Sequence, residues 1–395
     1  MVLVVGLGKK SPNSAKVKTT NPTAGNYRRQ LFSTIEAVLY RFLYKHLIAR
    51  FDAEKCHNAT MKAMYLISRV PGLTGLIRIF FSGSVGTLKG GWVGDERGLK
   101  SLARPVPGYL GLAAGMDKDA VAPLQFGAFG FAFVEVGTVT PRPQPGNEQP
   151  RLWRILPLRA VRNRMGFNNQ GAWEMASRLQ KLRTSAAGRS LILGVNLGKN
   201  KTTDLAAAAD DYRTSARLLA KYADYLVINV SSPNTPGLRS LQASEQLRQI
   251  GQAVISAGRQ SAGRQVPVLV KLAPDLEDDQ LKELAQIVKE VGLAGVIATN
   301  TTINHDFGEG GLSGPPLKER ALEVVRLLRQ ELGDDYLIIG CGGIEDEASA
   351  RQFLDAGADL LEAFTAMIYQ GPRFAGKLNK QLAGEIPALP LRKTR

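Results

Sequence analysis

Residues 229–237 (Asn-Val-Ser-Ser-Pro-Asn-Thr-Pro-Gly) place two asparagines and two serines directly after an apolar run. The run Tyr225–Ile228 is typical of a buried strand, and the prolines and glycine that follow predict that the strand ends there in a turn. All four short polar side chains can form hydrogen bonds with a ligand at the strand end. A solvated turn uses the same residue types, so this stretch alone leaves a binding site and an ordinary loop as alternatives.

A lysine interrupts a second apolar run, Val268–Leu272. Burying an ammonium group is costly unless it is paired or functional, so Lys271 is a candidate for binding a negatively charged group. The alternative is a lysine whose side chain reaches solvent from the end of the strand.

The elements that position these residues form a repeated unit after Trp92: a short apolar strand, a polar or glycine-containing tip and a helical stretch. Near-continuous hydrophobic strands that alternate with helices predict a parallel sheet covered on both faces. Eight such units in about 280 residues predict an α/β fold of the closed (β/α)8 TIM-barrel type, with an open doubly wound sheet as the alternative. The predicted strands are Leu110–Ala114, Phe131–Val136, Leu191–Asn196, Tyr225–Val230, Val266–Leu272, Gly295–Thr299, Tyr336–Gly340 and Asp359–Phe364.

Polar residues or glycines follow nearly every predicted strand, at the end where such barrels carry their active sites. The tips after strands 7 and 8, Gly340–Gly343 and Phe364-Thr365, could hold a phosphate. Glycines expose backbone N–H groups, and a following helix N-terminus adds a partial positive charge. No Gly-x-Gly-x-x-Gly motif opens the first helix, so a mononucleotide such as FMN is favoured over a dinucleotide.

The chain has 395 residues, 44% of them apolar, and a net charge of +16. Residues 1–104 contain 17 basic and 5 acidic residues, so this segment carries +12 of the excess. The alternatives are a solvated basic surface, a contact with an anionic membrane and a contact with nucleic acid. Two cysteines and three histidines, in no metal-binding spacing, argue against a disulfide framework and a zinc site. No apolar run approaches the ~18 residues of a membrane-spanning helix.

The N-terminal part divides into a tail and a helical extension. Residues 1–35 contain no acidic residue and predict a basic, disordered tail, with an organelle-targeting sequence as the alternative. Residues 36–85 predict two helices with apolar faces and basic flanks, broken at Pro71-Gly72. Such helices either lie in a membrane interface or pack on the main domain, which we place at residues 86–395.

Five motifs resemble those of the quinone-linked (class 2) dihydroorotate dehydrogenases and follow that family's order between Tyr40 and Pro372. They are residues 52–57 (Asp-Ala-Glu-Lys-Cys-His), 111–118 (Gly-Leu-Ala-Ala-Gly-Met-Asp-Lys), 150–154 (Pro-Arg-Leu-Trp-Arg), 163–169 (Asn-Arg-Met-Gly-Phe-Asn-Asn) and 229–237. The resemblance implies an FMN-binding TIM barrel with a two-helix, membrane-associating extension that forms a tunnel for a lipid quinone. The implied activity is oxidation of (S)-dihydroorotate to orotate in de novo pyrimidine (UMP) biosynthesis, with hydride transfer to FMN and electrons passed to ubiquinone or menaquinone.

The resemblance also implies a set of ligand-binding residues. FMN contacts are expected at Ala114, Gly115, Met116, Asp117, Lys118, Thr138, Asn196, Asn229, Lys271, Thr299, Gly314, Gly343, Phe364 and Thr365. Substrate contacts are expected at Lys118, Asn163, Arg164, Met165, Gly166, Phe167, Asn229, Asn234, Asn300 and Thr301. Members of the family often have tyrosine where this chain has Phe364, which removes one hydroxyl from the expected phosphate site.

Ser232 is the catalytic base that the resemblance implies. Class 1 relatives have a cysteine at this position, so the serine favours class 2. Serine is a poor base at its ordinary pKa, and we expect a water or threonine relay in a site closed to bulk solvent. His57 and Arg154 match the quinone-site residues, and both could donate hydrogen bonds to quinone carbonyls. The Gly-rich, acidic stretch 303–311 predicts a mobile loop over the site.

Two other functions are compatible with these patterns: an FMN barrel reductase that acts on another pyrimidine, including uridine in RNA, and a non-catalytic flavin-binding barrel. The basic excess lies in the N-terminal segment and no aromatic-basic motif is present, which argues against nucleic acid. A binding protein has no use for Ser232, Lys118 and Lys271 together. We therefore expect a monomeric, peripheral enzyme on the cytoplasmic side of the cell inner membrane, with no metal; the mitochondrial inner membrane is the alternative location.

Overall fold

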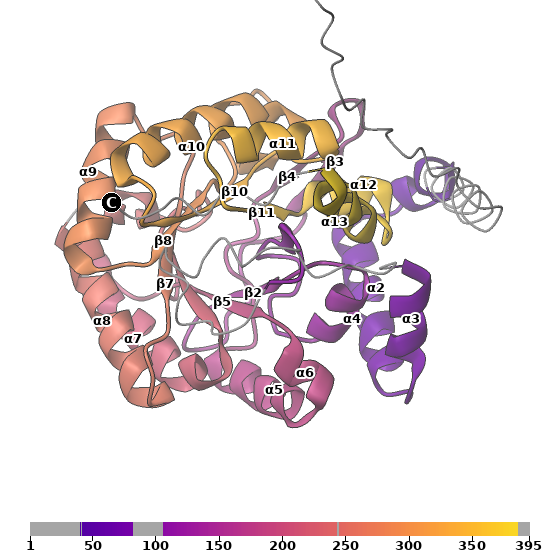
Figure 1. Cartoon of the computed structure of the whole chain (residues 1–395), viewed down its shortest axis with the longest axis horizontal. Helices are drawn as coiled ribbons and strands as arrows, with labels where there is room; N and C mark the ends of the chain where they lie inside the picture. The colour runs from indigo at the N-terminus through magenta and orange to yellow at the C-terminus, as the bar shows by residue number, and fades with distance from the viewer. Residues whose placement is uncertain (1–39, 41, 82–105, 243–244, 386–395) are drawn as a thin grey trace, which may run out of the picture.

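Eight parallel strands close into a barrel in the order β1-β11-β10-β8-β7-β6-β5-β2, and β2 pairs with β1 to complete it (Figure 1). The computed structural model describes residues 40, 42–81, 106–242 and 245–385; the predicted tail, residues 1–35, lies outside this part of the chain. The (β/α)8 prediction is confirmed, and the open doubly wound sheet is excluded. The barrel strands are Leu110–Leu112 (β1), Val134–Val139 (β2), Leu193–Leu197 (β5), Tyr225–Asn229 (β6), Val268–Leu272 (β7), Gly295–Ala298 (β8), Leu337–Cys341 (β10) and Leu360–Ala363 (β11).

Helices surround the barrel and cover the outer faces of the strands (Figure 1). They are Pro123–Ala128 (α4), Ala172–Thr184 (α5), Ala186–Ser190 (α6), Ala208–Leu219 (α7), Glu245–Ala262 (α8), Asp278–Val291 (α9), Lys318–Leu332 (α10), Glu347–Asp355 (α11), Thr365–Gln370 (α12) and Phe374–Glu385 (α13). In α9, for example, Leu281, Leu284 and Val288 recur at helical spacing and are fully buried. Gly292 ends this helix in the left-handed conformation, with φ of 76°.

The barrel interior is layered because alternate residues of each strand point inward. The bottom layer is apolar and includes Phe133, Tyr225 and Leu337. Gly111 and Gly194 make room for the two aromatic rings, since a Cβ at either glycine would lie 2.2 Å from a ring carbon of Phe133 or Tyr225. The packed bottom layer closes the barrel below and leaves the carboxyl ends of the strands for polar residues.

A second, three-stranded sheet in the order β3-β4-β9 lies outside the barrel. The antiparallel strands are Leu152–Ile155 (β3), Ala160–Asn163 (β4) and Gly311–Ser313 (β9). The sequence predicts only loops here. The pairing of β4 with β9 brings the segment after strand β2 next to the segment after strand β8. In this pairing Asn163 lies opposite Gly311, which is about 150 positions later in the chain.

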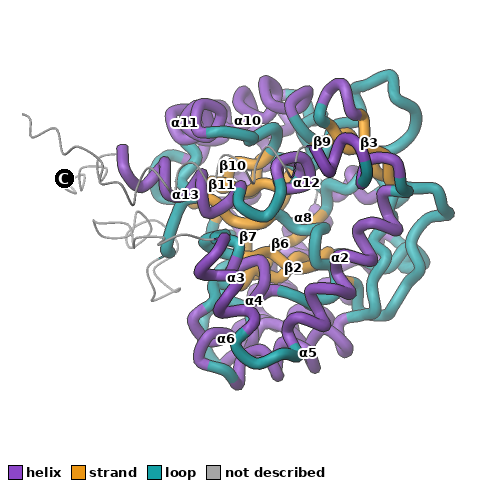
Figure 2. Tube along the Cα trace, turned by 90° about the vertical axis from the view of Figure 1, so that its right-hand side faces the viewer, coloured by secondary structure: helices purple, strands orange, loops and turns teal. Residues whose placement is uncertain are grey.

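The N-terminal extension consists of a helical segment at residues 42–46, a short 3-10 helix (Ile48–Arg50) and the helices Ala53–Ser68 (α2) and Leu73–Phe81 (α3). Asp52 caps α2 by accepting a hydrogen bond from the backbone of Lys55 at 2.8 Å. Helices α2 and α3 lie beside α4 on one side of the barrel (Figure 2). Among the described residues, no single helix has the length and composition to cross a bilayer. Helices α2 and α3 have that length and composition only when taken together, and they meet at a bend of 118°.

Candidate active site

A cavity of about 180 Å³ lies at the carboxyl ends of the barrel strands. Its wall collects tips from β1, β2, β6, β7, β8, β10 and β11, together with residues of α2, β4 and β9. Most residues predicted from the sequence meet there: His57, Ala114, Gly115, Lys118, Thr138, Asn163, Met165, Gly166, Phe167, Asn229, Ser232, Asn234, Lys271, Thr299, Asn300, Thr301, Gly314, Gly343, Phe364 and Thr365. Met116, Asp117, Arg154, Arg164 and Asn196 are not part of the wall.

The loop after β6 presents a buried hydroxyl and a pair of amides to the cavity. Ser232 is 5% exposed, and its Oγ accepts a hydrogen bond from the backbone N–H of Asn234 at 3.2 Å. The side-chain nitrogen of Asn234 donates to Oδ1 of Asn163 at 3.0 Å. Oδ1 of Asn234 is buried and has no hydrogen-bond partner among the described residues. A buried acceptor in this position needs a donor, and a ligand with an N–H group could supply it.

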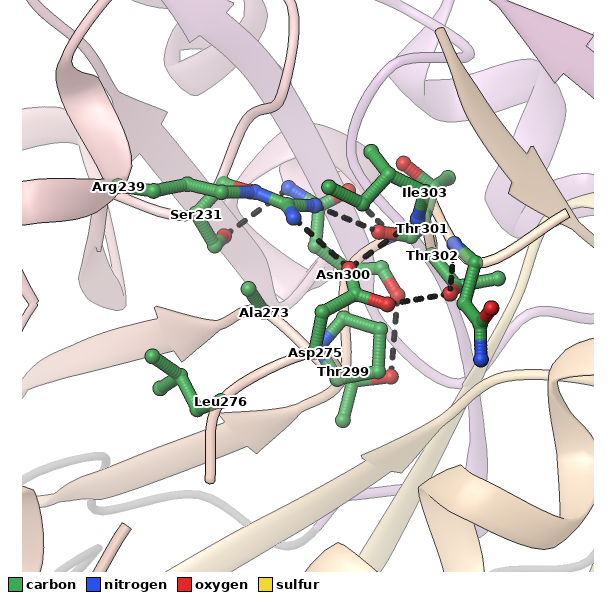
Figure 3. A network of polar contacts seen from close by, with 12 residues as sticks. Ser231, Arg239, Ala273, Asp275, Leu276, Thr299, Asn300, Thr301, Thr302 and Ile303 are labelled. Carbon is green, nitrogen blue, oxygen red and sulfur yellow. Dashed lines mark hydrogen bonds and ion pairs between the residues drawn. The ribbon is translucent and has the colours of Figure 1, made fainter. Parts of the chain in front are cut away.

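An arginine that the sequence analysis missed fixes this loop to the neighbouring strand tips (Figure 3). The guanidinium of Arg239 donates to the backbone oxygen of Ser231 at 3.0 Å, to Oδ2 of Asp275 at 2.7 Å and to the backbone oxygen of Thr301 at 3.0 Å. The amide of Asn300 donates to Oγ of Ser231 at 3.0 Å. The tips of β6, β7 and β8 therefore form one hydrogen-bonded frame around the cavity wall.

Thr138, Asn196 and Asn229 form a hydrogen-bonded set at the floor of the cavity. Oδ1 of Asn196 accepts from Oγ1 of Thr138 at 2.6 Å and from the amide of Asn229 at 3.0 Å. Asn196 is fully buried, so it lies beneath the residues that reach the cavity. Asn196 contacts the two residues that line the wall, and its own contact with a cofactor stays a prediction.

Lys271 is paired from below by two glutamates that the sequence analysis missed. Its Nζ lies 3.4 Å from Oε2 of Glu362 and 3.7 Å from Oε1 of Glu135. Burial alone would lower the pKa of Lys271, but the two carboxylates outweigh burial and raise it, so the lysine is charged at neutral pH. The signal in the sequence was one acidic residue inside each of two apolar strands, Val134–Val139 and Leu360–Ala363.

The opposite end of the cavity is rich in glycine. Gly314, Gly342 and Gly343 line the wall and have φ angles of 106°, 135° and 74°, which favour glycine. The hydroxyls of Ser313 and Thr365 lie 2.8 Å apart beside them. Arg159 and Glu345, which the sequence analysis also missed, line the same end and form an ion pair at 2.5 Å. This end offers the N–H groups, hydroxyls and cation that a phosphate monoester requires.

The third side of the cavity combines a cation with a neutral histidine. Burial lowers the pKa of Lys118 to about 8. Burial and the nearby charge of Lys118 lower the pKa of His57 to about 4, so this imidazole is neutral at pH 7. Neighbouring Asp117 faces away from the cavity and accepts hydrogen bonds from the backbone of Val121 and Ala122 at 2.7 and 2.8 Å. Asp117 therefore shapes the loop that carries Lys118.

The two other predicted cations are held by the protein itself. Arg154 donates to the backbone oxygens of Ile48 and Phe51 at 3.1 and 2.9 Å, and its guanidinium lies 5.9 Å from the ring centre of Tyr44. It fastens the extension to β3. Arg164 forms an ion pair with Glu309, which fixes the loop that follows β8 against the end of β4.

Met116 lines a second hollow of about 880 Å³ between α2 and α5.

Comparison with known proteins gives one family. The family model "Dihydroorotate dehydrogenase" matches residues 102–386. The chain is 47% identical over 355 residues to "Dihydroorotate dehydrogenase (quinone)" of Kineococcus radiotolerans, covering 87% of this chain and 94% of that protein. It is 49% identical over 369 residues to the protein of the same name from a Nocardioides species, covering 87% and 97%. The crystal structure of the Eimeria tenella enzyme in complex with ferulenol superposes with a TM-score of 0.73 at 36% identity, covering 84% and 90%.

Proposed function

The chain belongs to the dihydroorotate dehydrogenase family, among its quinone-linked members, and on this premise we propose that FMN occupies the cavity and that Ser232 is the catalytic base. The enzyme is a flavin-dependent oxidoreductase that oxidises dihydroorotate to orotate in pyrimidine biosynthesis. The three alternatives that the sequence left open are thereby reduced to one activity. The observation that supports the proposed site best is that the Ser232 hydroxyl, the Lys271 ammonium and the glycine-rich end line a single cavity.

The residues present fit FMN at both of its ends. A buried cation, Lys271, suits the pyrimidine edge of the flavin ring. Gly342, Gly343 and the hydroxyl of Thr365 suit the phosphate at the opposite end. Because Phe364 carries no hydroxyl, Ser313 and Thr365 supply the hydroxyl groups that this end offers. FMN held there would supply a hydride acceptor for the substrate and a two-electron donor for the quinone.

The substrate is held by amides and one ammonium group. Asn163, Asn234 and Asn300 line the wall, and an amide offers both a donor and an acceptor to a cyclic imide. Lys118 lines the same region and pairs with the substrate carboxylate. Oγ of Ser232 removes the proton from the carbon next to the one that loses hydride. Thr235, buried in the same loop, is our candidate for the relay that carries this proton away from Ser232.

The quinone side lies under the extension. His57 lines the cavity from α2, and its neutral imidazole can donate one hydrogen bond to a quinone carbonyl. Arg154 contributes by joining β3 to the segment that precedes α2. Apolar side chains of the extension are exposed, including Ile79 at 73% and Phe80 at 61%, and they support a peripheral contact with a membrane that contains the quinone. The proposed location remains the cytoplasmic side of the inner membrane, with a monomeric enzyme.

An anaerobic absorption spectrum of the purified protein tests the cofactor, the substrate and the quinone one after another. The protein is expected to be yellow, to release FMN on denaturation, to bleach on mixing with dihydroorotate and to regain its colour on addition of a soluble quinone analogue. A protein that binds no flavin would contradict the cofactor. Bleaching without recovery would contradict the quinone route alone, because the first step does not involve it.

A further inference from the structure

Glu135 and Glu362 lie inside the barrel on strands β2 and β11; Glu362 lines the cavity, and Glu135 lies outside its wall. Both side chains are fully buried. Each carboxylate directs one oxygen toward Nζ of Lys271, at 3.7 Å for Glu135 and 3.4 Å for Glu362. Two ionised carboxylates around one ammonium would leave a net charge of −1 in the barrel interior, where an unbalanced charge is expensive.

The hydrogen bonds of the carboxylate oxygens bear on this imbalance. Oε1 of Glu135 accepts a hydrogen bond from Asn196 at 2.9 Å. Oε2 of Glu135 and Oε1 of Glu362 are buried, and neither has a hydrogen-bond partner among the described residues. The two carboxyl groups lie within hydrogen-bonding reach of each other, so one proton held between them would make the group electrically neutral.

We propose that Glu135 and Glu362 share one proton beneath Lys271, and that they act as positioning residues that balance the charge which Lys271 presents to the flavin. The group then contains one carboxylate, one carboxylic acid and one ammonium. Burial and the charge of Glu135 raise the pKa of Glu362 well above its ordinary value, against the opposing charge of Lys271. The shared proton belongs to the pair of carboxylates.

The other titratable groups that face this pair are neutral and do not change the charge balance. Tyr225, on β6, has a pKa raised by burial and by the charges of Glu135 and Glu362, so it stays neutral. Burial raises the pKa of Cys341, on β10, to about 12, so this thiol stays neutral as well. The Tyr225 hydroxyl lies within reach of Glu135, and it is the other possible donor to the glutamates. Its removal is therefore the matched control.

Infrared spectroscopy of the full-length protein tests the proton directly and needs no bound flavin. At pH 8 the carbonyl stretch of a buried carboxylic acid is expected, with a shift in heavy water; Asp117, whose pKa burial raises to about 6, is ionised at this pH. The band should disappear in both Glu362→Gln and Glu135→Gln, because the remaining glutamate ionises as the sole partner of Lys271. It should persist in Tyr225→Phe. Absence of the band from the unmodified protein, or its persistence in Glu362→Gln, would overturn the proposal.

The midpoint potential of the bound flavin gives a second readout, and this one rests on the proposed FMN site. Each single glutamine variant should leave the potential close to that of the unmodified enzyme, because the net charge of the group stays at zero. The double variant leaves Lys271 unbalanced and should raise the potential by much more than the sum of the two single effects. Additive shifts would show that both carboxylates are ionised and would refute the shared proton. A protein without flavin would undermine the cofactor assignment while the infrared result still decides this proposal.

Discussion

The guanidinium of Arg151 grips the carboxylate of Glu54 across 97 positions of the chain, with Nε at 3.1 Å from both carboxylate oxygens and Nη2 at 2.8 Å from Oε1. The same arginine donates from Nη1 to the backbone oxygens of Pro145 and Asn147 at 2.6 Å. Both ends of the ion pair are buried. Glu54 lies one helical turn before His57 on α2, so this contact fixes the position of the histidine over the cavity.

Glu54→Ala is expected to weaken the docking of α2 by about 3–5 kcal/mol, because it leaves a buried arginine without its partner. Reoxidation of the reduced enzyme by a soluble quinone should slow, while reduction by dihydroorotate should stay near its original rate. Stopped-flow measurement of the two half-reactions separates these effects. Asp279→Asn removes the carboxylate from the exposed Asp279–Lys282 pair at 2.9 Å and should change neither rate. Equal slowing of both half-reactions would contradict a docking role.

Ser232→Ala is expected to retain FMN and to lose about 10²–10⁴-fold in the rate of flavin reduction by dihydroorotate at pH 7, which is the usual contribution of a general base. Orotate affinity should change little, since the variant keeps Asn163 and Asn234. Ser240→Ala is the matched control, because the Ser240 hydroxyl is exposed and bonds to the Gly237 backbone at 2.7 Å in the same loop. Anaerobic single-turnover kinetics measure the step, and an unchanged rate in Ser232→Ala would remove this residue as the base.

Gly343→Ala is expected to weaken FMN binding by about tenfold or more. The left-handed backbone at φ of 74° costs a residue with a Cβ roughly 1–2 kcal/mol, and the added carbon would lie 2.7 Å from Cβ of Lys318. Gly333 has φ of 71° and open space around it. Gly333→Ala therefore carries the backbone cost alone and should keep its flavin. Fluorescence titration of the apoprotein with FMN compares the two, and equal affinities would separate Gly343 from the phosphate site.

Orotate binding is expected to weaken above about pH 8, because the pKa of Lys118 is lowered to about 8 by burial. The charged ammonium pairs with the carboxylate below this pH, and affinity should fall by about tenfold per pH unit above it. In Lys118→Arg the charge persists at high pH, so this decline should be absent. Lys282→Gln, on the exposed surface, should follow the unmodified enzyme. Spectral titration with orotate between pH 6 and 10 provides the measurement.

The same lysine has a predictable effect on stability. The unfolded chain keeps the proton of Lys118 up to its ordinary pKa of 10.5, whereas the folded chain releases it near pH 8. Between these values the unfolded state binds more protons, so the contribution of Lys118 to stability rises with pH. Comparing the pH dependence of unfolding for the unmodified protein and Lys118→Met isolates this contribution, and it would be refuted by parallel curves.

The barrel and most of its rim could be predicted from the sequence because each strand is a nearly continuous apolar run that ends in a polar tip. Ser232, Lys271 and Gly343 occupy such tips, and the structure places all three on one cavity. The buried glutamates could not be assigned in the same way. The role of a single acidic residue in an apolar strand becomes clear only in the closed barrel, where β2 and β11 place their glutamates around the lysine of β7.

Long-range contacts account for the other omissions. The sheet β3-β4-β9 depends on a pairing between Asn163 and Gly311 that no local pattern announces. Arg239 lies in an unremarkable turn, and its partner Asp275 belongs to a different strand tip. Of the two arginines in residues 150–154, the resemblance draws attention to Arg154, whereas the structure shows that Arg151 is the one buried against the extension. Residue type alone did not distinguish them.

The β3–β4 ribbon has a consequence for inhibitors. Arg154 holds the extension from one strand, and Asn163 faces the substrate side from the other, opposite Leu152. Arg154 and Asn163 are therefore carried by the same short β-hairpin, so a movement of one displaces the other. A compound that separates the extension from Arg154 would shift the β3–β4 hairpin. It would therefore lower the affinity for orotate as well as block electron transfer to the quinone. Such a compound would show mixed inhibition toward both dihydroorotate and the quinone, although it would contact neither the orotate pocket nor the flavin.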